Sequence, residues 1–214
     1  MMDKGSMNRI VFHFDPISPF VYLAFHRLPE ALQGCSYEVE YRPLLFAALL
    51  KHWGHKGPAE IEPKRAWTFR HVQWLAQQHG LPLQAPLQHP FNPLPLLRLA
   101  LAAGPNRRVV EAVLAHVWQV GGDANDPARL AALRERLAPA RDPDGAQVKD
   151  ELRALTDQAV KDGLFGVPTL TLQGRHFWGL DALPMLLDAI QGGPWFVGPG
   201  WEDAGQSRAG VVRP

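Results

Sequence analysis

The chain has 214 residues, 46% of them hydrophobic, which is enough to bury a core and fits one domain with an insertion or two small domains. Its 22 basic and 21 acidic residues leave a formal net charge of +1, so the net charge provides no strong electrostatic attraction to nucleic acid or to a membrane surface. A single cysteine, Cys35, excludes an internal disulfide and any Cys-x-x-Cys pair. No apolar run approaches the roughly 20 residues of a membrane span, and we expect a cytoplasmic protein.

The first 44 residues predict a β-α-β unit. Arg9 to Phe14 ("RIVFHF") has the β-branched and aromatic content of a buried strand. A helix is expected from Ser18 to about Ala31, and the stretch from Ser36 ("SYEVEYRPLL") alternates as a strand does. This order implies two parallel strands joined by a right-handed crossover.

Helical periodicity dominates residues 45–163. The first predicted helix of this block contains "EPKRAWTFRHVQWLAQQHG" and stops at Gly80, and a second ends at Gly104-Pro105. Asp126-Pro127 is typical of an N-cap followed by proline at the first helical position. Another helix is expected from about Gly145 to Lys161. Tryptophan in such a block is more often core than ligand platform, and we expect this of Trp67, Trp74, Trp118 and the later Trp178.

The β signal returns after residue 163. "GVPTLTLQGRHFWG" predicts a strand, a turn at Gly174 and a second strand, and "DALPMLLDAIQGG" predicts a closing helix capped by Asp181. Residues 192–214 are rich in Gly and Pro and are expected to form a tail with little structure, apart from the docking of Trp195, Phe196 and Trp201.

This layout resembles the α/β thioredoxin-like fold of the DsbA type, with a helical domain inserted between the β-α-β and β-β-α halves. The implied domains are residues 9–44 plus 164–191, the insertion 45–163 and the tail 192–214. Four residues, Ser18-Pro19-Phe20-Val21, stand where that group carries Cys-x-x-Cys. Thiol–disulfide exchange by this chain alone is therefore excluded.

A narrower resemblance rests on four segments: "FHFDPISPFVYLAF", "PKRAWTFRHVQWLAQQHGLPL", "FNPLPLLRLALA" and "GVPTLTLQGRHFWGLDALPMLLDAI". Together they are similar to the 2-hydroxychromene-2-carboxylate isomerases and the kappa-class glutathione transferases over most of residues 9–191. The resemblance implies a serine, here Ser18, beside the sulfur of bound glutathione. A helix N-terminus favours an anion and lowers the pKa of a thiol held there, although Ser18 could instead be an ordinary N-cap.

Further site residues follow from the same resemblance. Pro168 matches the family's cis-proline, and Val167 would offer its backbone to the cysteinyl part of glutathione. Asp181 would meet the γ-glutamyl ammonium, and Lys64 would pair a carboxylate of the substrate or of glutathione. For each of the two charged residues an ordinary role, a helix cap or a solvated lysine, stays open.

The chain departs from the family at Leu180 and Ala182, which replace a polar residue and an arginine around the aspartate. His55 or Lys56 lies near the position where relatives carry a ligand-contacting asparagine, and either could replace that contact unless the pocket takes a different substrate. His55 is a candidate for the substrate pocket together with Asn92 and Trp67. Asn92 has an ordinary turn as its alternative. The His52-x-x-His55 spacing lacks a third ligand, so no metal is expected.

The resemblance implies a glutathione-dependent isomerase of a small aromatic substrate that acts by reversible addition of the glutathione thiolate. Glutathione is then a cofactor, and a homodimer is compatible with the sequence. Two alternatives remain: a kappa-like glutathione transferase or peroxidase, and a non-catalytic thioredoxin-fold binding protein.

Overall fold

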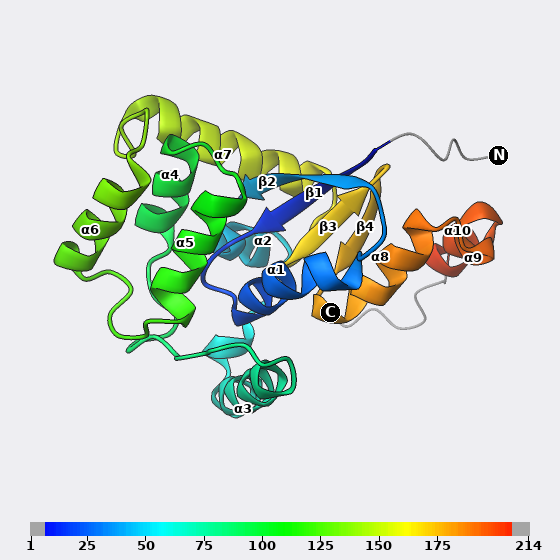
Figure 1. Cartoon of the computed structure of the whole chain (residues 1–214), viewed down its shortest axis with the longest axis horizontal. Helices are drawn as coiled ribbons and strands as arrows, with labels where there is room; N and C mark the ends of the chain where they lie inside the picture. Colours follow the sequence, from blue (N-terminus) through cyan, green and yellow to red (C-terminus); the bar gives the residue numbers. More distant parts are fainter. Residues whose placement is uncertain (1–6, 207–214) are drawn as a thin grey trace.

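A computed structural model describes residues 7–206. Its centre is a four-stranded sheet in the order β2-β1-β3-β4 (Figure 1). The strands are β1 (Asn8–Phe14), β2 (Tyr37–Pro43), β3 (Thr169–Leu172) and β4 (Arg175–Trp178). Strand β1 pairs in parallel with β2 and antiparallel with β3, and β3 pairs antiparallel with β4. The predicted thioredoxin-like arrangement of β-α-β and β-β-α halves around one sheet is confirmed.

The structure contains the predicted helices in the predicted order, together with short helices at residues 46–52, 194–197 and 200–205 that the sequence did not predict. They are α1 (Pro19–Ala31), α2 (Phe46–His52), α3 (Glu62–Gln78), α4 (Leu94–Ala102), α5 (Arg107–Trp118), α6 (Pro127–Leu137), α7 (Ala146–Lys161), α8 (Leu183–Ile190), α9 (Pro194–Val197) and α10 (Gly200–Gly205), with 3-10 turns η1 (Pro58–Glu60) and η2 (Leu180–Ala182). Asp126 caps α6 as predicted, because its carboxylate accepts from the N–H of Arg129 at 2.8 Å. Among the described residues no helix is both long and apolar enough to cross a membrane.

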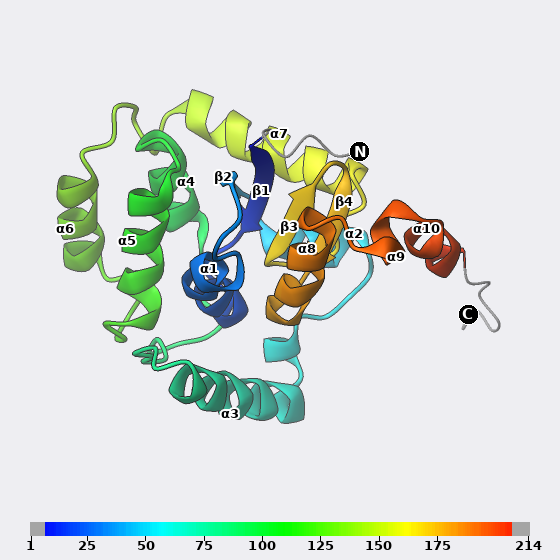
Figure 2. The same cartoon turned by 45° about the vertical axis from the view of Figure 1, so that its right-hand side comes forward.

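Helices cover both faces of the sheet. Helices α1 and α8 pack side by side on one face, and α7 with α2 lies behind the sheet on the other (Figures 1 and 2). Helix α3 stands apart from the other inserted helices and packs against α1 (Figure 2). Strand β1, which is central in the sheet, is therefore covered on both sides, as its nearly continuous apolar sequence indicates.

The inserted helices share a core with the sheet. One cluster of buried side chains joins Phe12 of β1, Phe25 of α1 and Trp118 of α5. The last inserted helix, α7, contacts β2, and the hydroxyl of Thr156 in α7 accepts a hydrogen bond from the N–H of Leu45 at 3.0 Å. The helical block from α2 to α7 is thus packed directly on the thioredoxin-like unit.

The β3–β4 hairpin turns at Gln173-Gly174. Both residues have positive φ, 51° and 80°, which is the conformation that a two-residue hairpin requires and that glycine adopts at little cost. The predicted turn at Gly174 is confirmed.

The prediction of a tail with little structure is wrong for residues 194–205. These residues form α9 and α10, which close on β4 through an aromatic cluster of Phe177, Phe196 and Trp201. Phe196 is only 4% exposed, and the guanidinium of Arg175 lies 5.8 Å from its ring centroid. The docking of the aromatic residues was expected, but the glycines and prolines around them hid the two short helices. Residues 207–214 of the predicted tail lie outside the described residues.

Candidate functional site

The loop from Asp15 to Ser18 connects β1 to α1. Asp15 is fully buried, and its two carboxylate oxygens accept from the N–H groups of Ile17 at 3.0 Å and Phe46 at 2.9 Å. Burial raises the pKa of Asp15 to about 7, while the two backbone hydrogen bonds act in the opposite direction. Asp15 therefore ties this loop to the start of α2.

Two side chains from the inserted block hold the same loop from the other side. The indole Nε1 of Trp118 donates to the carbonyl of Pro16 at 2.8 Å, and Nε2 of His89 lies 2.8 Å from the carbonyl of Ile17. Burial lowers the pKa of His89, which favours the neutral ring. Both carbonyls before Ser18 are thus bound by side chains from distant parts of the chain, Trp118 fully buried and His89 partly buried.

The hydroxyl of Ser18 does not cap its own helix. Ser18 is the N-cap residue of α1 and is 8% exposed, but its Oγ donates to the carbonyl of Val167 at 3.3 Å and makes no capping hydrogen bond. The ordinary-cap alternative for this side chain is therefore wrong. The Val167–Pro168 peptide bond is cis, as expected from the resemblance. The structure thus brings Ser18 and Val167 together across 149 positions of sequence.

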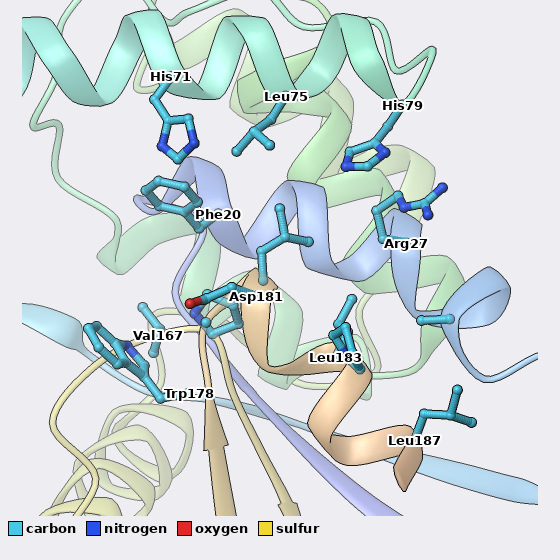
Figure 3. Close-up of a pocket in the computed structure, with 15 residues that line it drawn as sticks. Phe20, Arg27, His71, Leu75, His79, Val167, Trp178, Asp181, Leu183 and Leu187 are labelled. Atoms are coloured by element: carbon cyan, nitrogen blue, oxygen red, sulfur yellow. The ribbon is translucent and has the colours of Figure 1, made fainter.

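A pocket of about 710 Å³ opens beside this contact, between α1, α3 and the η2–α8 segment (Figure 3). This volume lies within the range of about 300–1,000 Å³ that is usual for small-molecule sites. The lining residues are Phe20, Arg27, Ala31, His71, Leu75, His79, Val167, Pro168, Trp178, Gly179, Leu180, Asp181, Leu183, Pro184 and Leu187. Most of these side chains are apolar, and Arg27, Asp181 and the two histidines are the polar groups among them.

Three of the predicted site residues line the pocket: Val167, Pro168 and Asp181. Asp181 is exposed to it, which fits a role in ligand contact. Its predicted role as the cap of the closing helix is wrong. Helix α8 begins after Ala182, and η2 begins after Gly179, neither with a side-chain cap. The intervening 3-10 turn frees the aspartate from the capping position.

The other predicted residues do not line the pocket. Lys64 is exposed on α3, two turns before His71 and on the same helical face, so its role stays a prediction. His55 is exposed in the loop after α2. Asn92 accepts from the N–H of Leu94 at 3.1 Å, which is the turn role left open for it. Trp67 stacks on the His71 ring at 5.9 Å and reaches the pocket only through that ring.

Three of the four tryptophans expected in the core are exposed. Trp118 is fully buried, but Trp67, Trp74 and Trp178 are 65%, 55% and 54% exposed. Helix α3 buries only Val72 and Ala76, so most of its aromatic residues face outward. Trp178 lies against Gly166, where an added Cβ would collide with the indole, and from there it forms part of the pocket wall.

Several lining residues escaped sequence reasoning, chiefly Arg27, His71 and His79. His71, Leu75 and His79 recur at i, i+4 and i+8, which places them on one face of α3. This spacing is visible in the sequence, but no local sequence pattern shows which face of α3 meets α1 and α8. Only the packing of the three helices decides this.

Comparison with known proteins agrees with this geometry. A sequence profile described as a DSBA-like thioredoxin domain matches residues 9–191. A 2-hydroxychromene-2-carboxylate isomerase of Sphingobium xenophagum is 29% identical over 188 residues, which is 83% of this chain and 95% of that protein. Glutathione S-transferase kappa 2 of Caenorhabditis elegans is 25% identical over 204 residues, or 85% of this chain and 91% of that protein.

A solved structure described as a 2-hydroxychromene-2-carboxylate isomerase superposes with a TM-score of 0.76 at 24% identity, covering 94% of this chain and all of the other. At this sequence identity the structural similarity establishes the fold alone. The profile match spans most of the chain and includes both halves of the sheet, the Ser18 turn and the Val167–Pro168 loop. The chain therefore belongs to the DsbA-like thioredoxin family, among relatives named as 2-hydroxychromene-2-carboxylate isomerases and kappa-class glutathione transferases.

Proposed function

We propose that this chain is a glutathione-dependent isomerase of a small aromatic intermediate of the 2-hydroxychromene-2-carboxylate type. The observation that carries the proposal is the meeting of the Ser18 hydroxyl with Val167, next to Pro168, at the edge of a pocket that also contains Asp181. The names of the relatives point to the same reaction class.

The residues present fit glutathione. The start of α1 supplies the N–H of Phe20 and the positive end of the helix dipole, both of which favour a thiolate, whereas Pro19 has no N–H and the N–H of Val21 donates to the Ser18 carbonyl. The Ser18 hydroxyl donates to Val167 in the structure and is free to rotate toward a sulfur atom. The Asp181 carboxylate, exposed in the pocket, suits the γ-glutamyl ammonium.

When bound, glutathione supplies a thiolate that adds reversibly to a conjugated double bond, which can rotate as a single bond before the thiol leaves. Ser18 would keep the sulfur ionised by donating a hydrogen bond to it. Phe20 and Trp178 form walls that suit an aromatic ring. The neutral His89 and the indole of Trp118 would keep the Ser18 turn in place.

The proposal is tested by two measurements on the intact protein. Isothermal calorimetry should show one glutathione per chain, and 2-hydroxychromene-2-carboxylate should be isomerised only when glutathione is present, with no net loss of free thiol. Failure to bind glutathione would leave the non-catalytic binding protein as the better description, an alternative motivated by the apolar Leu180 and Ala182.

A glutathione transferase or peroxidase is the second candidate, because kappa-class transferases are among the relatives. The same pocket would serve it. Stoichiometric loss of free thiol during turnover, measured by titration with a thiol reagent, would favour the transferase or peroxidase over the isomerase.

A further inference from the structure

The pocket has two ends of different character. Val167 and Trp178 lie at the end near Ser18, whereas Arg27 and His79 lie together at the opposite end (Figure 3). On α3 the first end is marked by His71 and the second by His79, eight residues later, which is about 12 Å of helix. We call the second end, formed by Arg27, Ala31, His79, Leu183 and Leu187, the distal site.

The walls of the distal site are apolar. Leu183 and Leu187 of α8 lie across the pocket from α3, whose Leu75 points into it between His71 and His79 (Figure 3). Ala31 of α1 also lines the pocket. Leu180 extends this apolar lining toward the middle of the pocket. A hydrocarbon body would remove these leucine side chains from water, and such burial stabilises a complex in proportion to the apolar area that is covered.

One permanent cation lies among these apolar walls. The Arg27 side chain is 24% exposed, and its partner Glu30, one turn later on α1, is 64% exposed. An ion pair with a solvated partner contributes little to stability, so the anion of a ligand can replace Glu30. Burial, and then the charge of Arg27, lower the pKa of His79, so Arg27 carries the positive charge of this site.

We propose that the distal site binds an apolar carboxylic acid, with its carboxylate on Arg27 and His79 and its hydrocarbon body along Leu183 and Leu187. The planar guanidinium fork of arginine matches a carboxylate, and one cation balances a single negative charge better than a doubly charged phosphate ester. The distal site is separate from the thiol site at Ser18 and does not depend on glutathione.

The test uses the intact chain without glutathione. Octanoate, its neutral isostere octanamide and the short butanoate are titrated by isothermal calorimetry. We expect saturable 1:1 binding of octanoate, and affinity at least about tenfold lower for octanamide, because the charge-assisted hydrogen bonds are lost. Butanoate should also bind at least about tenfold more weakly, since fewer methylene groups reach the leucines. Absence of saturable octanoate binding, or equal affinities for octanoate and octanamide, would overturn the proposal.

Variants separate the proposed roles. Arg27→Gln should lower octanoate affinity to that of octanamide, whereas Glu30→Gln should raise octanoate affinity because it removes the competing carboxylate. The matched control is Arg153→Gln, which removes an equally spaced pair with Asp150 on the exposed face of α7 and should change nothing. Wild-type octanoate affinity in Arg27→Gln, or weaker binding in Glu30→Gln, contradicts the proposal.

A second variant covers the case in which Arg27→Gln does not fold. Leu187 is partly buried, and Leu187→Glu places a carboxylate beside the bound hydrocarbon. Octanoate binding should be lost in this variant, and unchanged octanoate affinity would overturn the proposal. A glutathione titration of the same protein shows separately whether the thiol site is intact, so failure at one site is distinguishable from failure at the other.

Discussion

At the scale of single residues, the hydroxyl of Ser18 faces a carbonyl on another segment and not the N–H groups of its own helix. Its removal therefore costs one ordinary hydrogen bond, of about 0.5–1.5 kcal/mol. The start of α1 loses no capping hydrogen bond, because the hydroxyl makes none. The loss of a donor to a bound thiolate would be larger and would affect only the loaded protein.

We expect Ser18→Ala to fold and to bind glutathione with a raised thiol pKa, because the anion loses a hydrogen-bond donor. Turnover should fall by about one to two powers of ten, the equivalent of about 1.5–3 kcal/mol for a charge-assisted hydrogen bond. Titration of the thiolate absorbance measures the first effect, on the order of one pH unit or more. An unchanged thiol titration in a folded variant would contradict the assigned role.

Asp15 and His13 are both buried, and their contributions to the free energy of unfolding change with pH in opposite directions. Burial raises the pKa of Asp15 from 3.8 to about 7, so the folded state binds this proton more tightly, and the Asp15 contribution falls as pH rises from about 4 to 7. Burial, with Arg42 second, lowers the pKa of His13 from 6.5 to about 4, so the His13 contribution falls as pH drops from 6.5 toward 4.

Asp15→Asn should therefore remove the component that falls with pH, and the free energy of unfolding should rise more steeply between pH 4 and 7 than in the wild type. His13→Gln should do the opposite over pH 4–6.5. Urea unfolding at a series of pH values measures both slopes. Equal slopes in all three proteins would mean that neither group titrates differently in the folded and unfolded states.

At the scale of elements, α5 reaches the site through its last residue. Trp118 donates to the carbonyl of Pro16, so the inserted helical block positions the turn that precedes Ser18. The opposite end of α5 offers a control, because Asn106 caps the helix by accepting from the N–H of Val109 at 3.1 Å, far along the helix from Ser18.

We expect Trp118→Phe to lower turnover more than its loss of stability explains, because the Pro16 carbonyl loses its donor and the Ser18 turn gains freedom. Asn106→Ala should cost about 0.5–2 kcal/mol of stability while leaving turnover per folded molecule nearly intact. Unfolding curves and rates at equal folded fraction separate the two. Equal losses of turnover in both variants would show that Trp118 acts through stability alone.

At the scale of the whole molecule, α9 and α10 close the end of the sheet at β4. Phe196 is buried against Phe177, α9 and α10 lie on the side of α8 away from α3 (Figure 2), and none of residues 194–205 lines the pocket. This segment should therefore contribute to stability without touching the site.

Phe196→Ala should lower the free energy of unfolding by about 3–5 kcal/mol, the usual cost of emptying a buried aromatic position. Val197→Ala next to it, 70% exposed, should cost about 0.5 kcal/mol or less. Chemical denaturation measures both, and glutathione affinity of the folded proteins should stay at the wild-type value. A small effect of Phe196→Ala would mean that the two short helices are not docked.

The sequence alone determined the order of the strands and of the longer helices, the Asp126 cap and the Gly174 turn, and its resemblance to a known family suggested the candidate roles of Ser18, Val167 and Asp181. Those features depend on periodicity and on backbone demands within a few residues, or on motifs that resemble a known family. The Asp126 cap, the Gly174 turn and the strand order are retained in the structure, whereas the roles of Ser18, Val167 and Asp181 in ligand binding stay proposals.

Tertiary structure decided the rest. Only packing shows that the Ser18 hydroxyl donates to Val167 and that three tryptophans face outward. It also shows that Asp181 does not cap a helix, and that Arg27 and His79 line the same end of the pocket. Each of these depends on how α1, α3 and α8 approach one another. The side-chain contacts that set this approach join residues far apart in the chain, so no local pattern encodes them.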